Sequence, residues 1–276
     1  MLTYGFAQRA LAGGVLIAVV CSLLSFFVVV RRLAFVGMGI SHAAFGGVGL
    51  GLAAGIDPVL TAGFFCAALS LGIGWFSRRG RVHEDTAIGI LFAAAMALGV
   101  LLVRMAKAYN LDLMSYLFGS ILALGWGDVA TIAAVAVLVS AFVLLFFKEL
   151  IFVSFDEETA TASGLPVRSV YYGLLLAMAV TIVVSIKLVG IVLVSALLVI
   201  PGAAGMQLAR NYRGVLAVSL TVGTGCVVAG LYLSFWLDVA SGAAIVLTLF
   251  AAFLLCMLLS PRRSYLRRLR GGAGKA

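Results

Sequence analysis

Residues 154–168, SFDEETATASGLPVR, form a short polar segment within a sequence that is otherwise almost continuously apolar. Three of the ten carboxylates of the chain stand side by side in it, at Asp156, Glu157 and Glu158. Acidic residues favour the first turn of a helix, and Gly164 with Pro166 favours its end. We therefore expect one or two helical turns here, which is more structure than a plain connection between two membrane spans requires.

The sequence on both sides of this segment is too apolar for a soluble protein. Of the 276 residues 64% are hydrophobic and 11% are charged, and the mean hydropathy is +1.23. Runs of about 20 apolar residues, enough to cross a hydrocarbon core of about 30 Å, recur along the chain. Because backbone groups in lipid must bond internally, such spans are helical. We predict an all-α, polytopic transmembrane bundle of eight or nine spans, placed at 10–30, 35–55, 59–77, 86–103, 128–147, 170–186, 188–206, 214–236 and 240–260.

The basic residues give an orientation, since Lys and Arg gather on the cytoplasmic side of membrane proteins. With nine spans and the C-terminus inside, 15 of the 19 Lys and Arg residues lie on the inner side. This pattern explains the net charge of +9 without nucleic acid, and the polar segment faces the cytoplasm. In an eight-span alternative, part of 188–206 is re-entrant and the segment stays inside. The four exceptions to the inner location are Arg9, Arg104, Lys107 and Lys187.

The chain contains no motif with which it could drive transport by itself. It lacks a Gly-x-x-x-x-Gly-Lys-Ser/Thr phosphate loop. A carrier driven by protons or sodium usually places several carboxylates inside its spans, whereas the carboxylates here fall at the predicted ends of spans. We predict a transport subunit without catalytic residues, whose energy source lies outside the chain. A secondary carrier or a channel is the less favoured alternative.

His42 is the one ionisable residue well inside a predicted span. Met38 precedes it by four residues and so shares its helical face, where it offers a thioether beside the imidazole. Imidazole is a common ligand for zinc, iron and manganese. We predict a metal site at His42 with Met38 as a weaker ligand. The alternatives are that His42 bonds a neighbouring helix and that Met38 only packs in the core.

Glycines are dense around this histidine, and Gly47, Gly51 and Gly55 recur at every fourth position. That spacing gives one smooth helix face against which a second helix can pack closely. The second helix belongs either to the same chain or to a pore or dimer interface.

A second unusual segment, 104–127, is too polar to span the membrane and too apolar for a free loop. Its aromatic residues suit the depth of the lipid headgroups. We expect an interfacial or re-entrant segment on the outer face, serving as an anchor, a lid or a docking surface. The aromatic residues are Tyr109, Tyr116 and Trp126.

Three stretches in the same order resemble one known family. They are the double arginine with Gly37, Ser41 and His42, then 162–168 (ASGLPVR), then 187–204 (KLVGIVLVSALLVIPGAA). With them, essentially the whole chain resembles the ABC-3 or zinc/manganese permease family, the membrane permeases of ATP-binding-cassette importers for zinc, manganese and iron.

The resemblance implies a set of partners. Two permease copies, in a homodimer or a pair, sit in a bacterial plasma membrane. They receive metal from an extracytoplasmic metal-binding protein and are driven by a cytoplasmic ATPase dimer that binds ATP. No permanent cofactor is implied, and the metal ion is cargo. The single permease domain would comprise residues 1–260, followed by a basic cytoplasmic tail at 261–276.

In such a permease the segment 154–168 is the coupling helix, which docks on the ATPase. Glu157 and Glu158 would face basic groups of the partner, beside Asp156, while Ala162, Gly164 and Leu165 would pack against it. A solvated acidic loop is the alternative.

Pro201 would break the helix of the span at 188–206 and serve as a pivot.

One position departs from the family pattern. Many members carry an aspartate at the position of Met38, where it pairs with the histidine on the metal. Because manganese prefers oxygen ligands, its loss favours zinc, with iron or manganese possible. A permease for a metal chelate, of the siderophore or cobalamin type, is the remaining alternative.

Overall fold

The computed structural model describes residues 5–79, 83–106, 119 and 124–260. Within these ranges the chain is helical and contains no strand, which confirms the predicted all-α class. The helices are α1 (Gly5–Val30), α2 (Ala34–Ala54), α3 (Pro58–Arg79), α4 (Glu84–Met105), α6 (Trp126–Leu145), α7 (Phe147–Phe155), α8 (Glu157–Ala162), α9 (Val167–Leu208), α10 (Tyr212–Leu237) and α11 (Ser241–Leu259).

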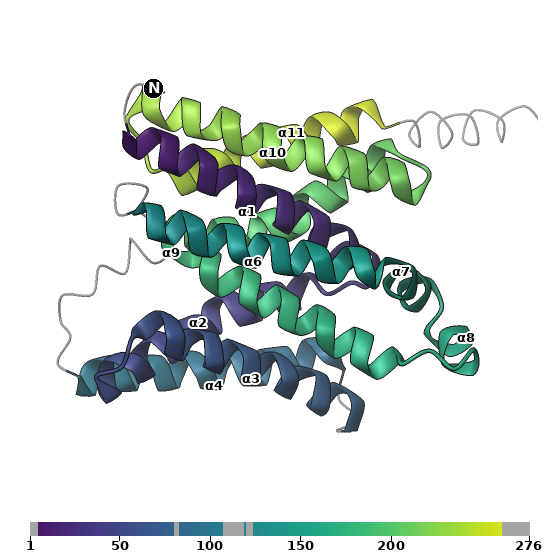
Figure 1. Ribbon diagram of the computed structural model, residues 1–276, viewed down its shortest axis with the longest axis horizontal. Helices are drawn as coiled ribbons and strands as arrows, with labels where there is room; N and C mark the ends of the chain where they lie inside the picture. Colours follow the sequence, from purple (N-terminus) through teal and green to yellow (C-terminus); the bar gives the residue numbers. More distant parts are fainter. Residues whose placement is uncertain (1–4, 80–82, 107–118, 120–123, 261–276) are drawn as a thin grey trace, which may run out of the picture.

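Helix α9 contains two membrane spans. Gly190 interrupts it with φ 77° and ψ 163°, a conformation that essentially only glycine adopts. The chain turns back at this point, as Figure 1 shows, so that both ends of α9 lie on the same side of the bundle. The two spans are Val167–Ile186 and Val189–Leu208.

Nine helical segments of the described chain are long and apolar enough to cross a membrane. They match the nine predicted crossings to within a few residues at each end. The second half of α9, at Val189–Leu208, is long and apolar enough to cross by itself, which favours nine spans over the re-entrant alternative.

The helices form three groups across the bundle. In Figure 1, α2, α3 and α4 lie together on one side, α10 and α11 lie on the other, and α1, α6 and α9 lie between them. In α1, α2 and the first span of α9, 67% of the most apolar window is buried, compared with 22% in α4. The former are therefore the most enclosed helices, whereas α4 presents most of its surface outward.

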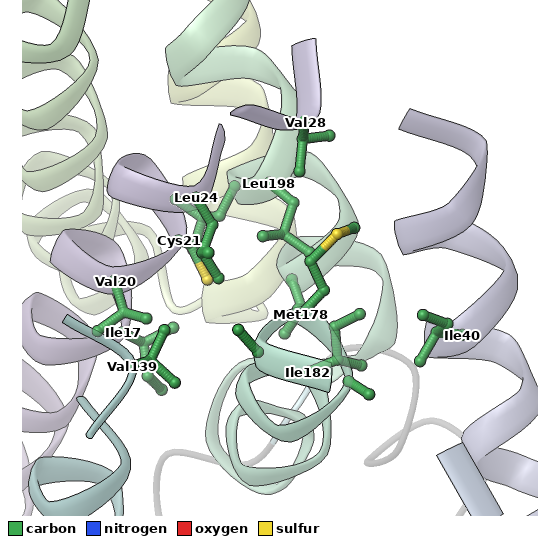
Figure 2. Close-up of a cluster of buried hydrophobic side chains, with 14 of the residues drawn as sticks. Ile17, Val20, Cys21, Leu24, Val28, Ile40, Val139, Met178, Ile182 and Leu198 are labelled. Carbon is green, nitrogen blue, oxygen red and sulfur yellow. The ribbon is translucent and has the colours of Figure 1, made fainter. Parts of the chain in front are cut away.

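The core joins the central group to its neighbours through large apolar side chains. Figure 2 shows Leu24 of α1 and Leu198 of α9 close to Met178 and Ile182, which lie in the first half of α9. Ile40 of α2 faces the same cluster.

The two ends of the bundle differ. Helices α7 and α8 lie at one end with the C-terminus of α11, and the start of α1, the end of α4 and the start of α6 lie at the other (Figure 1). We call the end that holds α7 and α8 the inner end, because the distribution of basic residues predicts that it faces the cytoplasm.

Glycines let α2 pack closely between α3 and α4. A Cβ on Gly47 or Gly51 would come within 2.5 or 2.8 Å of an α3 backbone carbon, and one on Gly46 or Gly49 within 2.7 or 2.9 Å of an α4 carbonyl. Two residues of the predicted stripe therefore pack within the chain. Gly55 does not, since it ends α2 with φ 67° and a Cβ there would meet nothing.

Two predictions fall largely outside the described residues. The tail at 261–276 is one of them, and most of the segment 104–127 is the other. The described end of that segment begins α6, where the carboxylate of Asp128 accepts a hydrogen bond of 2.9 Å from the N–H of Gly125. Trp126 beside it is 59% exposed.

Candidate metal path and coupling surface

The imidazole of His42 is held in one tautomer. Its Nδ1 lies 2.9 Å from the carbonyl oxygen of Met38, one turn earlier in α2. Because a carbonyl only accepts hydrogen bonds, Nδ1 carries the proton of the neutral ring and Nε2 keeps a free lone pair. Histidines that bind metals usually have this arrangement, in which the second nitrogen donates to a carbonyl or carboxylate.

The ring is also fixed from the neighbouring helix. Phe92 of α4 meets it edge to face, with ring centroids 5.6 Å apart and an interplanar angle of 88°. The alternative prediction for His42 was a hydrogen bond to a neighbouring helix. The contact with α4 is a ring contact that leaves Nε2 unoccupied, and the hydrogen bond of the ring lies within α2.

Met38 and His42 lie on a face of α2 that the core does not cover. Phe35 is 56% exposed and Met38 is 43% exposed, whereas Val36 and Ile40 on the opposite face are buried. Met38 is therefore not a core residue of the isolated chain, and its thioether lies on the same face as the imidazole. The described residues contain no group of three or more His, Cys, Asp or Glu side chains that could hold a metal. One chain thus contributes an imidazole and a thioether, fewer ligands than the four of a tetrahedral site.

The double arginine forms the turn between α1 and α2. The N–H of Leu33 donates to the carbonyl of Val28 (2.8 Å), and that of Arg32 donates to Val29 (3.2 Å). These two bonds define a Schellman end to α1, in which the residue at the position of Arg32 is usually glycine because it is left-handed. Arg32 has φ 59°. The turn fixes the backbone at Arg31.

The Arg31 side chain points inward and joins three elements. It is 9% exposed, and its Nη2 lies 2.8 Å from Oε2 of Glu157, at the start of α8. Its guanidinium carbon lies 5.0 Å from the ring centroid of Tyr171 in α9, within cation–π range. The two arginines of the motif thus differ, because Arg32 is exposed.

Asp156 begins α8 as its N-cap. One carboxylate oxygen accepts the N–H of Thr159 (2.9 Å) and the other accepts its hydroxyl (2.5 Å). The hydroxyl bond first, and the backbone bond second, hold the pKa of Asp156 below its ordinary value. Asp156 therefore serves the local structure of α8.

The end of α8 is a second Schellman motif. The N–H of Leu165 donates to the carbonyl of Ala160 (3.2 Å), and that of Gly164 donates to Thr161 (3.0 Å). Gly164 has φ 78°, the left-handed conformation that this motif needs. Leu165 packs on the core and Ala160 is fully buried. The predicted contact residues Gly164 and Leu165 thus stop α8 and anchor it.

The surface available to a partner is smaller than the segment 154–168. Of the predicted contact residues that do not anchor or cap α8, Glu158 and Ala162 are exposed. Phe155, which ends α7, is 66% exposed and was not predicted. Its position directly before the three carboxylates was the available signal, because a large apolar residue beside a charged group is typical of an interface.

Pro201 lies where three helices cross. The N–H of Gly202 donates to Oγ of Ser25 in α1 (2.8 Å), and a Cβ on Gly223 of α10 would lie 3.3 Å from Cγ of Pro201. Proline has no N–H, so it removes one bond of the helix at this crossing. The crossing, the α2 face and α8 are three separate regions of the structure.

A family model and known proteins match nearly the whole chain. The family model, described as the ABC 3 transport family, covers residues 3–260. The manganese transport system membrane protein MntC of Halalkalibacterium halodurans is 35% identical over 97% of this chain and 92% of its own. MntC of Listeria innocua is 36% identical over 96% of this chain and 95% of its own.

A solved structure agrees with these sequence matches. PsaBC from Streptococcus pneumoniae, determined in complex with a Fab, superposes with a TM-score of 0.85 and 32% identity. The match covers 96% of this chain and 95% of that one. The family resemblance inferred from the sequence is confirmed.

Proposed function

The chain belongs to the ABC 3 transport family, and we propose that it is the permease through which a bacterial importer brings manganese into the cytoplasm. It is the membrane subunit of a metal importer, with nine spans and, in the sequence, no phosphate loop of its own. Manganese is proposed because relatives 35% and 36% identical over nearly the whole chain are named as manganese transport proteins.

The observation that carries the proposal is the orientation of His42. Its Nε2 is the free nitrogen of a ring fixed by the Met38 carbonyl and by Phe92, on a helix face that the chain leaves uncovered. In this proposal Nε2 binds the metal as it passes and Met38 adds a weak ligand. A second permease copy, packed against the same face, supplies the matching pair of ligands.

Zinc is the second candidate cargo, favoured by the ligand types. Imidazole suits zinc and a thioether is soft, whereas manganese prefers oxygen. The described residues bring no carboxylate to His42 in a metal-binding group. For manganese, oxygen ligands would have to join the imidazole and the thioether.

ATP hydrolysis on a partner supplies the energy in this proposal. A cytoplasmic ATPase dimer would dock on the exposed part of the inner end, with Glu158 facing basic groups and Phe155 and Ala162 packing against it. An extracytoplasmic binding protein would deliver the metal at the opposite end. The chain itself does no chemistry on its cargo.

The experiment is metal uptake by proteoliposomes that contain the chain with its ATPase and metal-binding protein. We expect ATP-dependent uptake of radioactive manganese, faster than that of zinc at equal concentration. Faster uptake of zinc would replace manganese by the second candidate. Uptake without the ATPase would indicate a secondary carrier or channel, and uptake of a siderophore-bound metal in place of the bare ion would indicate a chelate permease.

A further inference from the structure

Arg31 joins the proposed coupling helix to the helix that carries His42. We infer that Arg31 is a positioning residue, which makes the turn between α1 and α2 follow any movement of α8. The inference rests on the proposed function, because it assigns a route by which the ATPase acts on the metal path.

Helix α8 has few attachments to the bundle. It is six residues long, and Ala160 is its one buried residue. Leu165, just beyond it, packs on the core. The Arg31–Glu157 ion pair is a side-chain bond that links α8 to an element distant in sequence, since the two residues are 126 positions apart. This pair therefore gives α8 a direct link to the end of α1, beside its connections along the chain to α7 and α9.

Separating this pair is costly because of where the arginine lies. Its side chain is 9% exposed, and Nη1 is buried without a hydrogen bond to the described residues. If α8 moved away alone, the guanidinium would stay buried and lose its carboxylate, and a buried charge without its partner is strongly destabilising. The pair is more stable when Arg31 moves with α8.

The backbone at Arg31 then transmits the movement to α2. The Schellman bonds of Arg32 and Leu33 hold the turn rigid, and α2 begins at Ala34. His42 lies farther along the same helix, about 12 Å from Ala34 at 1.5 Å per residue. Tyr171 holds the guanidinium against the first span of α9. The same movement therefore shifts this span together with α2.

This assignment gives the neighbouring acidic residues different roles. Glu157 was expected to face the ATPase, but its carboxylate is bonded to Arg31. Glu158 is exposed and remains available to the partner. Glu157 thus works inside the permease and Glu158 at its surface.

The test compares Arg31→Gln, Glu157→Gln and the double variant with the native chain, at equal amounts of assembled complex in proteoliposomes. Arg32→Gln is the matched control, because Arg32 is adjacent and exposed. The readouts are metal transported per ATP hydrolysed and the ATPase rate relative to the free ATPase. We expect each single variant to lower metal transported per ATP about tenfold, the size of effect that fits loss of a charged hydrogen bond. The double variant should be no worse than the worse single variant, and Arg32→Gln should match the native chain.

The two readouts separate the inference from the proposed function. If the native chain carries no metal, the proposed function fails, and the rate at which the permease stimulates its ATPase still tests the pair. If Arg31→Gln does not assemble, Glu157→Gln tests the inference by itself. The Glu157 side chain is 42% exposed, so replacing it leaves the core intact. Unchanged coupling in Glu157→Gln, or losses in the two single variants that simply add in the double variant, would overturn the inference.

Discussion

At the scale of single residues, backbone contacts decide which glycines can be replaced. Gly230 of α10 packs on α11, and a Cβ there would lie 2.6 Å from the Cα of Ile245, whereas Gly225 faces open space. Gly230→Ala is therefore expected to destabilise the protein by about 1 to 3 kcal/mol. Thermal unfolding in detergent measures this, with Gly225→Ala as the matched control, unchanged or slightly more stable. Equal unfolding temperatures for the two variants would mean that α10 packs elsewhere.

A second prediction at this scale concerns the cap of α8. Asp156→Ala removes the acceptor of the Thr159 N–H, so hydrogen exchange at that amide should speed up about fivefold. Asp156→Asn keeps a hydrogen-bond acceptor and should change the exchange rate of this amide little. Because the folded pKa of Asp156 lies below its ordinary 3.8, the stabilisation is complete above that pH and is lost as pH falls through the lower folded value. A protection factor of the Thr159 amide that changes neither with the substitution nor with pH would contradict the cap.

The roles of individual residues in 154–168 were only partly predictable. The turn residues and the acidic cluster correctly indicated a short helix. Gly164 and Leu165 were assigned to the partner interface, which stays a prediction. In the structure they also end α8, a role that the Gly-Leu pattern serves as well. The partner of Glu157 could not be found at all, because Arg31 lies 126 positions away and no local spacing connects them.

At the scale of elements, the sequence predicted spans well and short helices poorly. Nine crossings follow from length and hydropathy, which depend on the lipid more than on tertiary contacts. Helix α7 was not distinguished from the span before it. The apolar run of α6 continues into α7 through residues such as Leu150 and Val153, which are buried. The break at Phe146, with φ −100° and ψ 23°, has no sequence signal.

The element-scale prediction concerns the second span of α9, where we propose Pro201 as a pivot. Pro201→Ala restores the missing N–H, and alanine is favoured over proline in a helix interior by about 3 kcal/mol. The variant should unfold at the same or a higher temperature and carry metal more slowly, because the span bends less easily. Calorimetry and the uptake assay measure the two effects. Native uptake in a more stable variant would show that Pro201 is not a pivot.

At the scale of the whole molecule, the orientation of the bundle can be tested with cysteines. The four native cysteines are buried, so they should not react with a membrane-impermeant maleimide. Ser163→Cys at the inner end and Ile56→Cys between α2 and α3 place exposed thiols at opposite ends. In right-side-out vesicles only the Ile56 variant should be labelled. Labelling of the Ser163 variant instead would invert the topology.

The measurement that tests the central claim most directly compares the two histidines of the chain. His42 lies on the uncovered face of α2, and His83 is exposed before the first turn of α4. In proteoliposomes with the ATPase and binding protein, His42→Gln should lower ATP-dependent metal uptake at least about tenfold, since it removes the free Nε2. His83→Gln should leave uptake unchanged. Equal uptake by both variants would mean that the metal does not pass by His42.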